Sequence, residues 1–201
     1  LDSRLLCAAC EGRTESHMAA ALEPETLRSV AEFHEAFKVP VVHTGPAIPE
    51  KARAELRVAL LQEELNELKA AIASDDVVEC ADALADLQYV LSGAVLEFGM
   101  QNRFKALFDE VHRSNMSKAC ATREDAEETV THYKVRKGED AIVEERAGGQ
   151  GFLVLRTPDR KVLKSVRYSP ADLSPVLFPQ DEVGPPCEQE TKRRKLAFDE
   201  V

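Results

Sequence analysis

The sequence predicts an all-α fold, a four- to five-helix bundle, with a small antiparallel β-appendage toward its C-terminal end. Three observations support this prediction. Apolar residues recur at helical spacing between residues 24 and 131. Two long segments of strong helix formers are joined by a very short turn, and residues 132–168 are richer in β-branched and aromatic residues. We therefore expect the helical part over 24–131 and the β-appendage over 132–168.

The first three predicted helices follow one another closely. An amphipathic helix lies between Pro24 and Pro40, with apolar residues at spacings of three and four. Two longer helices run over about 50–73 and 77–98, separated only by residues 74–76. A connection this short implies an antiparallel helical hairpin.

Further elements are expected after the hairpin. Apolar spacing indicates a helix over about 104–111. Another helix begins at Thr122, because Thr122 and Asp125 suit a capping box. Segments separated by Gly-Gly and Pro-Asp pairs predict three short strands. These strands are expected at 141–145, 151–156 and 161–166.

The two ends of the chain differ in composition from its middle. Residues 1–20 are expected to be a poorly ordered N-terminal extension, and since the chain does not begin with methionine, we expect a fragment or processed form whose natural start is nearer Met18. Residues 21–177 are predicted to form one domain. The tail, 178–201, is rich in proline and charge and predicted to be disordered. Its basic run at 192–195 would suit a nuclear-import signal.

The overall charge argues against two kinds of partner. A net charge of -10 and a pI near 5.1 do not suit a protein that binds nucleic acid or a membrane surface through phosphate. No apolar run approaches the roughly 18 residues that span a bilayer. Five cysteines, an odd number, suit a reducing compartment. We therefore expect a soluble cytoplasmic protein without a nucleic-acid or membrane partner.

Six acidic residues on the predicted hairpin form the most informative group. Spacings of three, four and seven positions place each set on one face of its helix. In an antiparallel hairpin the two faces meet at the same height, because Glu67 then lies level with Asp82 and Glu63 with Asp86. The group consists of Glu63, Glu64 and Glu67 on the first helix and Glu79, Asp82 and Asp86 on the second.

This acidic group lacks basic neighbours. No lysine or arginine occurs between Lys69 and Arg103, and Glu64 stands on an apolar stripe where a core would favour leucine. Like charges at these spacings repel one another, so a positive ion should offset them. Oxygen ligands in this number suit Mg²⁺, with Mn²⁺ as the alternative ion. The other interpretation is an acidic patch with a structural role only.

The same residues resemble a known family. Residues 63–67, Glu-Glu-Leu-Asn-Glu, resemble the EExxE motif of the MazG-type all-α nucleoside triphosphate pyrophosphohydrolases, a superfamily with MazG-like, dUTPase-like and phosphoribosyl-ATP pyrophosphohydrolase-like members. Residues 79–82, Glu-Cys-Ala-Asp, resemble its ExxD motif. Residues 86–89, Asp-Leu-Gln-Tyr, resemble the DLxY of some relatives, a register that puts Ala83 at the glutamate position. The resemblance covers about 24–118.

The resemblance implies a role for each candidate residue. Glu64 and Glu63 would be catalytic, with Glu63 orienting the attacking water or helping a further metal ion. The implied metal ligands are Glu64, Glu67, Glu79, Asp82 and Asp86. The implied phosphate and sugar contacts are Arg113, Asn115, Lys118, Lys161 and Lys164. The implied contacts to the nucleobase are Phe33, His34, Phe37, Asn66 and Tyr89.

The resemblance also implies an activity. It is the Mg²⁺-dependent hydrolysis of a nucleoside triphosphate to the monophosphate and pyrophosphate. The substrate would be a deoxypyrimidine or non-standard deoxynucleotide, and the reaction would remove unwanted nucleotides from the cellular pool. Two alternatives stay open: a phosphoribosyl-ATP pyrophosphohydrolase, and a non-catalytic helical oligomerisation module. Because the apolar faces of so short a bundle are commonly covered by a second copy, we expect a homodimer or homotetramer.

Overall fold

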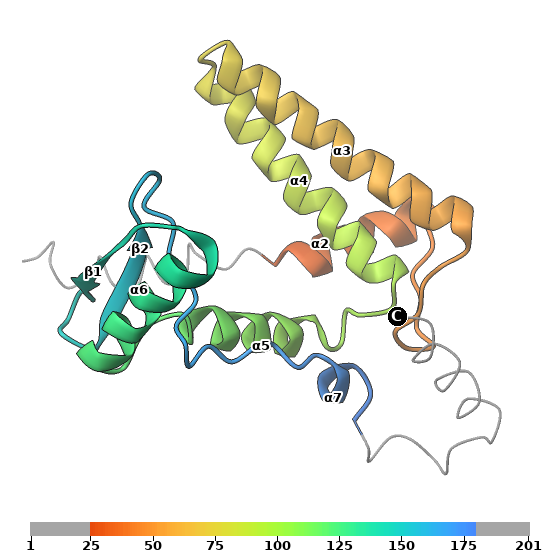
Figure 1. Cartoon of the computed structure of the whole chain (residues 1–201). Helices are drawn as coiled ribbons and strands as arrows, with labels where there is room; N and C mark the ends of the chain where they lie inside the picture. Colours follow the sequence, from red (N-terminus) through yellow and green to blue (C-terminus); the bar gives the residue numbers. More distant parts are fainter. Residues whose placement is uncertain (1–24, 180–201) are drawn as a thin grey trace, which may run out of the picture. The chain divides into compact units, whose positions relative to one another are not determined.

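The structure is a computed structural model that describes residues 25–179. The predicted fold class, all-α with a small antiparallel β-appendage, is confirmed. The predictions for residues 1–20 and for the basic run at 192–195 lie outside the described residues. The elements, in chain order, are α2 (Thr26–Ala36), α3 (Lys51–Ala73), α4 (Val77–Glu97), α5 (Phe104–Met116), α6 (Arg123–Lys137), β1 (Ala141–Glu145), β2 (Phe152–Arg156) and α7 (Ser174–Leu177) (Figure 1).

The chain divides into two compact units, one ending at Gln101 and the other beginning at Asn102. The first unit contains α2, α3 and α4, and the second contains the remaining elements. The single domain that we predicted over residues 21–177 stays a prediction. No helix in the described part of the chain is both long and apolar enough to cross a membrane, and the expected cytoplasmic location also stays a prediction.

The helices α3 and α4 form the predicted antiparallel hairpin and lie side by side (Figure 1). The chain reverses between them because Asp75 adopts a positive φ of 56°. Aspartate tolerates this conformation better than most residues. The Asp76 carboxylate then accepts hydrogen bonds from the backbone N–H groups of Val78 and Glu79. This cap begins α4 directly after the turn.

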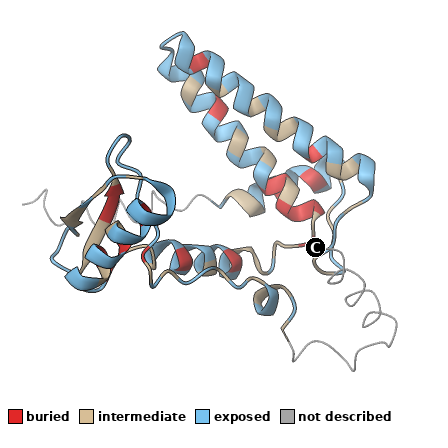
Figure 2. Ribbon diagram, viewed as in Figure 1, coloured by how far each residue is buried: buried red, intermediate tan, exposed pale blue. Residues whose placement is uncertain are grey.

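The core of the first unit lies where α2 packs against the C-terminal half of α4. Val30 of α2 and Val95 and Leu96 of α4 are buried there. Figure 2 shows this concentration of buried residues, whereas the end of the hairpin near the turn is mostly exposed. The packing of α2 therefore divides the hairpin into a covered half and a half whose side chains meet solvent.

The loop between α2 and α3 is tied to the end of α4. Val42 N–H donates to the Leu96 carbonyl and Ala47 N–H to the Phe98 carbonyl, each at 3.1 Å. Gly99 ends this region with a φ of 67°, and a Cβ there would clash with the Gly45 carbonyl. A glycine is therefore required where the loop and the helix end approach each other.

In the second unit, α6 packs against the antiparallel pair β1 and β2. Thr122 Oγ1 accepts a hydrogen bond from Asp125 N–H at 3.1 Å, so the predicted helix start is confirmed. The helix continues to Lys137 and ends at Gly138, which has a φ of 67°. The helical part therefore extends past residue 131, where we expected it to end.

The predicted third strand over 161–166 is wrong. Only an isolated bridge between Leu155 and Val162 forms there. Beyond it the backbone donors bind elsewhere: Ser165 N–H donates to the Lys118 carbonyl and Val166 N–H to Thr129 Oγ1. These bonds pull the segment toward α6 and end its pairing with β2.

Candidate active site

Four of the other five predicted acids lie around Glu64. Glu64 is half-buried, while the other four are exposed. The pKa of Glu64 is raised, first by its partial burial and then by the negative charges of Glu67, Asp86, Glu63 and Asp82. Because Asp82 and Asp86 come from α4 and the others from α3, the structure brings together carboxylates from both helices of the hairpin.

The acids around Glu64 have no built-in counter-charge. In the part of the chain that the structure describes, no lysine or arginine forms an ion pair with any of the six predicted acids. An acid nearer the start of α3 differs, because Glu55 pairs with Lys51 at 3.6 Å. The crowded carboxylates therefore repel one another without compensation from the described residues, which favours an external cation.

The sixth acid, Glu79, lies in the first turn of α4, where its N–H donates to Asp76. Its carboxylate is not among those that raise the pKa of Glu64. Of the three predicted acids of α4, Asp82 and Asp86 therefore influence Glu64, one from each of the two motif registers. Among residues 25–179, no three acidic, histidine or cysteine side chains could hold a metal ion as they stand. The predicted metal ligands stay a prediction.

An exposed aromatic surface lies between α2 and α4. The rings of Phe33 and Phe37 stack with centroids 4.4 Å apart, and Tyr89 meets Phe33 edge-on at 5.7 Å. All three side chains are exposed. Tyr89 is three positions from Asp86, so it lies on the neighbouring turn of α4. We call these three residues the aromatic surface; its position suits a flat ring bound beside the acids.

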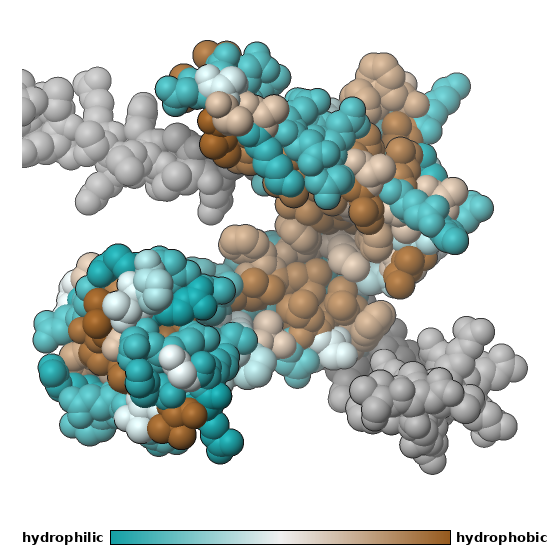
Figure 3. Space-filling view, turned by 45° about the horizontal axis from the view of Figure 1, so that its top comes forward, coloured by the Kyte–Doolittle hydropathy of each residue, from teal (hydrophilic) through white to brown (hydrophobic). Residues whose placement is uncertain are grey.

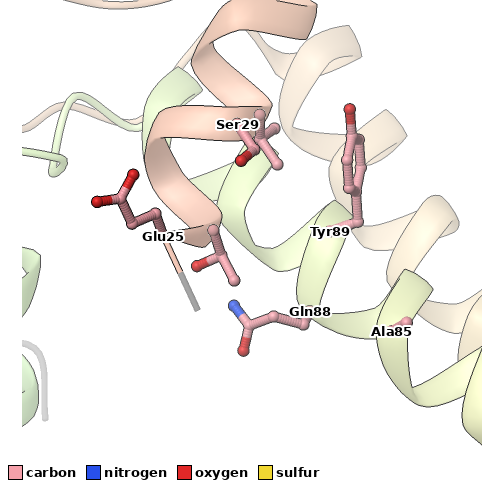
Figure 4. A pocket seen from close by; sticks show the side chains of 7 residues that line it. Glu25, Ser29, Ala85, Gln88 and Tyr89 are labelled. Carbon is pink, nitrogen blue, oxygen red and sulfur yellow. The ribbon is translucent and has the colours of Figure 1, made fainter. Parts of the chain in front are cut away.

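A hollow of about 160 Å³ lies next to the aromatic surface (Figure 4). Its polar groups include the Ser29 hydroxyl and the Gln88 amide, whose Nε2 also donates to Ser92 Oγ at 3.2 Å. Asn66, another predicted base contact, is not among the residues that line the hollow; it is exposed on α3 and accepts a hydrogen bond from Gln62 at 2.9 Å. The hollow is lined by Glu25, Thr26, Ser29, Val30, Ala85, Gln88 and Tyr89.

The structure argues against His34 as a base contact. Its side chain is buried, with the residue only 2% exposed. Nδ1 lies 2.9 Å from the Pro40 carbonyl oxygen, and Nε2 lies 3.4 Å from Nη2 of Arg57. Both ring nitrogens are therefore occupied inside the protein, and the imidazole does not belong to the exposed aromatic surface.

A buried charged group beneath α2 was not anticipated. Glu97 of α4 is 1% exposed and binds the guanidinium groups of both Arg53 and Arg57 of α3. Burial alone would raise the pKa of Glu97, but the two arginines outweigh it and lower the pKa. The sequence signal that could have predicted this buried group was Arg57, which stands seven positions before Glu64 and therefore on nearly the same face of α3.

Arg113, a predicted phosphate contact, is engaged within the second unit. Its Nε and Nη2 donate to the Glu110 carboxylate, each at 2.8 Å. The same guanidinium donates to Ser169 Oγ at 3.1 Å and to the Pro170 carbonyl at 3.0 Å. Arg113 therefore holds the segment that follows residue 168 against α5.

Two of the three predicted lysines, Lys118 and Lys164, lie near a tyrosine that sequence reasoning missed. Tyr168 OH and Ser114 Oγ are 2.9 Å apart, and Lys164 Nζ lies 4.3 Å from the centroid of the Tyr168 ring. The Ser114 hydrogen bond lowers the pKa of Tyr168, and the charges of Lys164 and Lys118 lower it further. Lys118 also donates to Asn115 Oδ1 at 2.7 Å. These residues form a basic cluster in the second unit.

Lys161, the remaining predicted phosphate contact, is exposed, and its backbone carbonyl accepts a hydrogen bond from Arg156 N–H at 2.9 Å. The predicted phosphate contacts therefore belong to the second unit, while the acids and the aromatic surface belong to the first. Their joint action on one ligand stays a prediction.

Comparison with known proteins agrees with the motifs. Residues 30–115, which contain all six acids, match the family model described as phosphoribosyl-ATP pyrophosphohydrolase. Over 74 residues, 35% of this chain, the sequence is 38% identical to an uncharacterized protein of Acanthamoeba polyphaga mimivirus. The matched segment spans 30% of that protein's length. Residues 30–115 are therefore similar to the phosphoribosyl-ATP pyrophosphohydrolase domain, part of the MazG-like superfamily of nucleotide pyrophosphohydrolases.

Proposed function

We propose that this protein hydrolyses a nucleoside triphosphate to the nucleoside monophosphate and pyrophosphate. One observation carries the proposal: the half-buried Glu64 is crowded by four carboxylates from two helices and has no basic partner among the described residues. Such an arrangement favours binding of cations and, through them, of a polyphosphate. The family whose model residues 30–115 match is one of nucleotide pyrophosphohydrolases.

The donor set fits Mg²⁺, and Mn²⁺ as a substitute. Carboxylate oxygens are the ligands that both ions favour, and several of them lie within interacting distance of Glu64. When bound, Mg²⁺ would neutralise the phosphate oxygens and the pyrophosphate leaving group. The residues that would hold it are Glu64, Glu67, Asp82 and Asp86, with Glu79 one turn away on α4.

The chain itself would supply the base and the orientation. Water attacks the α-phosphorus, the bond to the oxygen bridging the α- and β-phosphorus atoms breaks, and the water proton passes to a carboxylate. Glu64 would act in this step together with Glu63, which would orient the water; the raised pKa of Glu64 describes the site before a cation binds. Lys118, Lys164 and Asn115 would stabilise phosphate charge, while Arg113 would keep the adjacent segment in place.

The proposed substrate class is a deoxypyrimidine or non-standard deoxynucleoside triphosphate. The aromatic surface offers exposed rings for stacking against a base, and the neighbouring hollow offers the Ser29 hydroxyl and the Gln88 amide for its polar edge. Phosphoribosyl-ATP is the alternative substrate, in keeping with the family name.

The test is a panel of standard and modified deoxynucleotides together with phosphoribosyl-ATP, assayed for pyrophosphate with Mg²⁺ or Mn²⁺. Glu64→Gln should lower kcat by at least about a hundredfold, since it removes a base or ligand at the reacting group. Glu55→Gln is the matched control, because Glu55 lies on the same helix but pairs with Lys51. Full activity in Glu64→Gln would contradict the proposal. If Mg²⁺ raised the melting temperature but no nucleotide gave pyrophosphate, the non-catalytic oligomerisation module would be the better account.

A second copy of this chain is the proposed partner. Figure 3 shows hydrophobic side chains reaching the surface, and on the hairpin these residues repeat every seven positions, as in a coiled coil. Since consecutive helical residues advance by about 100°, Leu65 and Glu63 flank Glu64 on opposite sides. The stripe therefore lies away from the acidic face. It consists of Val58, Leu65 and Ile72 on α3 and Val77, Leu84 and Leu91 on α4.

The stripes of two copies of the chain are uncharged and have the same spacing, so they would pack against each other and form a dimer. Further association would give a tetramer. Leu84→Glu should convert the protein to a monomer, measured by light scattering after size exclusion. Val135→Glu, at an exposed apolar position on α6, is the control. A wild-type protein that is monomeric at high micromolar concentration would contradict this assembly.

A further inference from the structure

Three elements of the first unit meet at one buried group. His34 comes from α2, Arg57 from α3 and Glu97 from α4. The Arg57 side chain is 8% exposed and Glu97 1%. Charges so deeply buried are tolerated only when they are paired and hydrogen-bonded. We refer to His34, Arg57 and Glu97 as the α2 anchor.

The hydrogen bonds of the anchor determine which form of His34 is present. A guanidinium group can only donate, so Nη2 of Arg57, 3.4 Å away, requires His34 Nε2 to accept. The Pro40 carbonyl, 2.9 Å from Nδ1, requires that nitrogen to donate. His34 is therefore neutral, with its proton on Nδ1. Protonation would place a second N–H against Arg57 and break the contact.

The surroundings leave the anchor little freedom. A Cβ added at Gly93 of α4 would lie 2.6 Å from Nη1 of Arg57 and 3.1 Å from Nε2 of His34. Both distances are closer than ordinary contacts, so α4 carries a glycine where the two side chains pack against it. The positions of the imidazole and the guanidinium are thus set by the backbone of α4 as well as by each other.

The anchor also determines where α2 presents its aromatic residues. Val30 and His34 are the buried residues of this 11-residue helix. Phe33 precedes His34 and reaches across to Tyr89 of α4. Rotation or withdrawal of α2 would therefore move Phe33 and Phe37 relative to Tyr89 and open the aromatic surface.

We propose that His34, acting through Arg57 and Glu97, is a positioning residue for nucleobase binding: it holds α2 so that the aromatic surface is formed. This inference rests on the proposed function and assigns His34 a different part in it from the contact first expected. The charged groups around the imidazole are Arg57 and Arg53 of α3 and Glu97 of α4, together with the Pro40 carbonyl. Burial, followed by the arginines, outweighs Pro40 and Glu97 and lowers the pKa of His34.

The test separates base binding from phosphate binding. Wild type, His34→Ala and His34→Gln are titrated calorimetrically, with Mg²⁺ present, with the α,β-imido analogues of dUTP and dCTP and with inorganic triphosphate, which has no base. His34→Ala should bind the analogues at least about tenfold more weakly, while its affinity for triphosphate stays within about twofold. His34→Gln should recover most of the loss, since its amide oxygen can accept from Arg57. His43→Gln, an exposed histidine, is the control.

A pH series supplies the second readout. As the pH falls below 6.5, the ordinary pKa of histidine, the ratio of analogue to triphosphate affinity should fall in wild type, because protonation of His34 breaks its contact with Arg57, and stay constant in His34→Gln. The proposal would be overturned if folded His34→Ala bound the analogues as tightly as wild type does. It would also be overturned if His34→Ala lost as much affinity for triphosphate as for the analogues, because that result indicates a general scaffold role. If His34→Ala does not fold, a constant ratio in wild type would overturn it instead. The proposed function itself would be contradicted if wild type bound triphosphate, failed to bind either analogue and hydrolysed no nucleotide.

Discussion

Two glutamates of the same hairpin, Glu64 and Glu97, have opposite environments. Glu97 is fully buried, yet its pKa is lowered, because two arginines outweigh the cost of burial. Glu64 is only half-buried, yet its pKa is raised, because burial is reinforced by four carboxylates. Burial alone therefore does not distinguish a structural acid from a functional one. The difference lies in the counter-charge: the protein supplies it for Glu97, whereas for Glu64 we propose that a bound cation does.

The two environments follow from the packing of α2. The half of the hairpin that α2 covers excludes water, so a charge there needs a partner within the protein. In the other half Glu63, Glu67, Asp82 and Asp86 face solvent, where unpaired carboxylates cost little. Acids that would destabilise a core can therefore persist there, where we propose that they bind cations.

The largest expected effect comes from breaking the buried group. Glu97→Gln leaves Arg57 without its anionic partner in a site that is 8% exposed. Removing one member of a buried ion pair typically costs about 3–5 kcal/mol, and the free energy of unfolding should fall by this order. Urea unfolding followed by circular dichroism measures it. A loss below about 1 kcal/mol would show that Glu97 is not the structural acid that the comparison requires.

Mg²⁺ should increase the stability of the protein by binding to the acids around Glu64. At a free Mg²⁺ concentration about a hundredfold above Kd, a single site adds about 2.7 kcal/mol to the free energy of unfolding. We expect this gain in wild type and in Glu55→Gln, and little of it in Glu64→Gln. The melting temperature with and without Mg²⁺ measures the gain. Equal stabilisation of all three proteins would place the ion elsewhere.

The two arginines that bind Glu97 should contribute unequally. Arg57 is 8% exposed and Arg53 33% exposed, so water replaces Arg53 more easily. Arg57→Lys should therefore destabilise by about 2 kcal/mol and Arg53→Lys by about half as much, since lysine cannot reproduce the guanidinium geometry. Chemical denaturation of both variants provides the comparison. The reverse order would contradict the assignment of Arg57 to the centre of the group.

The smallest effect concerns pH, and its sign differs between the glutamates. Because the pKa of Glu97 is lowered, its stabilisation is present above the ordinary value of 4.5 and lost as pH falls through the folded pKa. Because the pKa of Glu64 is raised, its contribution is present below 4.5 and lost as pH rises through the folded pKa. In metal-free buffer, Glu64→Gln should therefore be more stable than wild type at pH 7 by several tenths of a kcal/mol. The free energy of unfolding of wild type, Glu64→Gln and Glu97→Gln is measured from about pH 3 to 7. The difference from wild type should change with pH in opposite directions for the two variants, and the same direction in both would refute this prediction.

Local pattern was sufficient for the helices and for the hairpin. Helix starts such as Thr122 depend on neighbouring residues only, and so does the reversal at residues 74–76. The third strand failed for the opposite reason. Residues 161–166 have the composition of a strand, but the N–H groups of Ser165 and Val166 donate to Lys118 and Thr129, which the local sequence does not reveal.

The sequence by itself determined that two acidic faces occur on one hairpin, because helix periodicity and turn length place residues at known heights and angles. Only the tertiary structure decided that Asp82 and Asp86, and not Glu79, act on Glu64, since this depends on how α3 and α4 rotate against each other. It also decided that His34 is buried against Arg57 and that Arg57 meets Glu97, 40 residues away. Contacts between elements depend on packing, and packing is not encoded in any single segment.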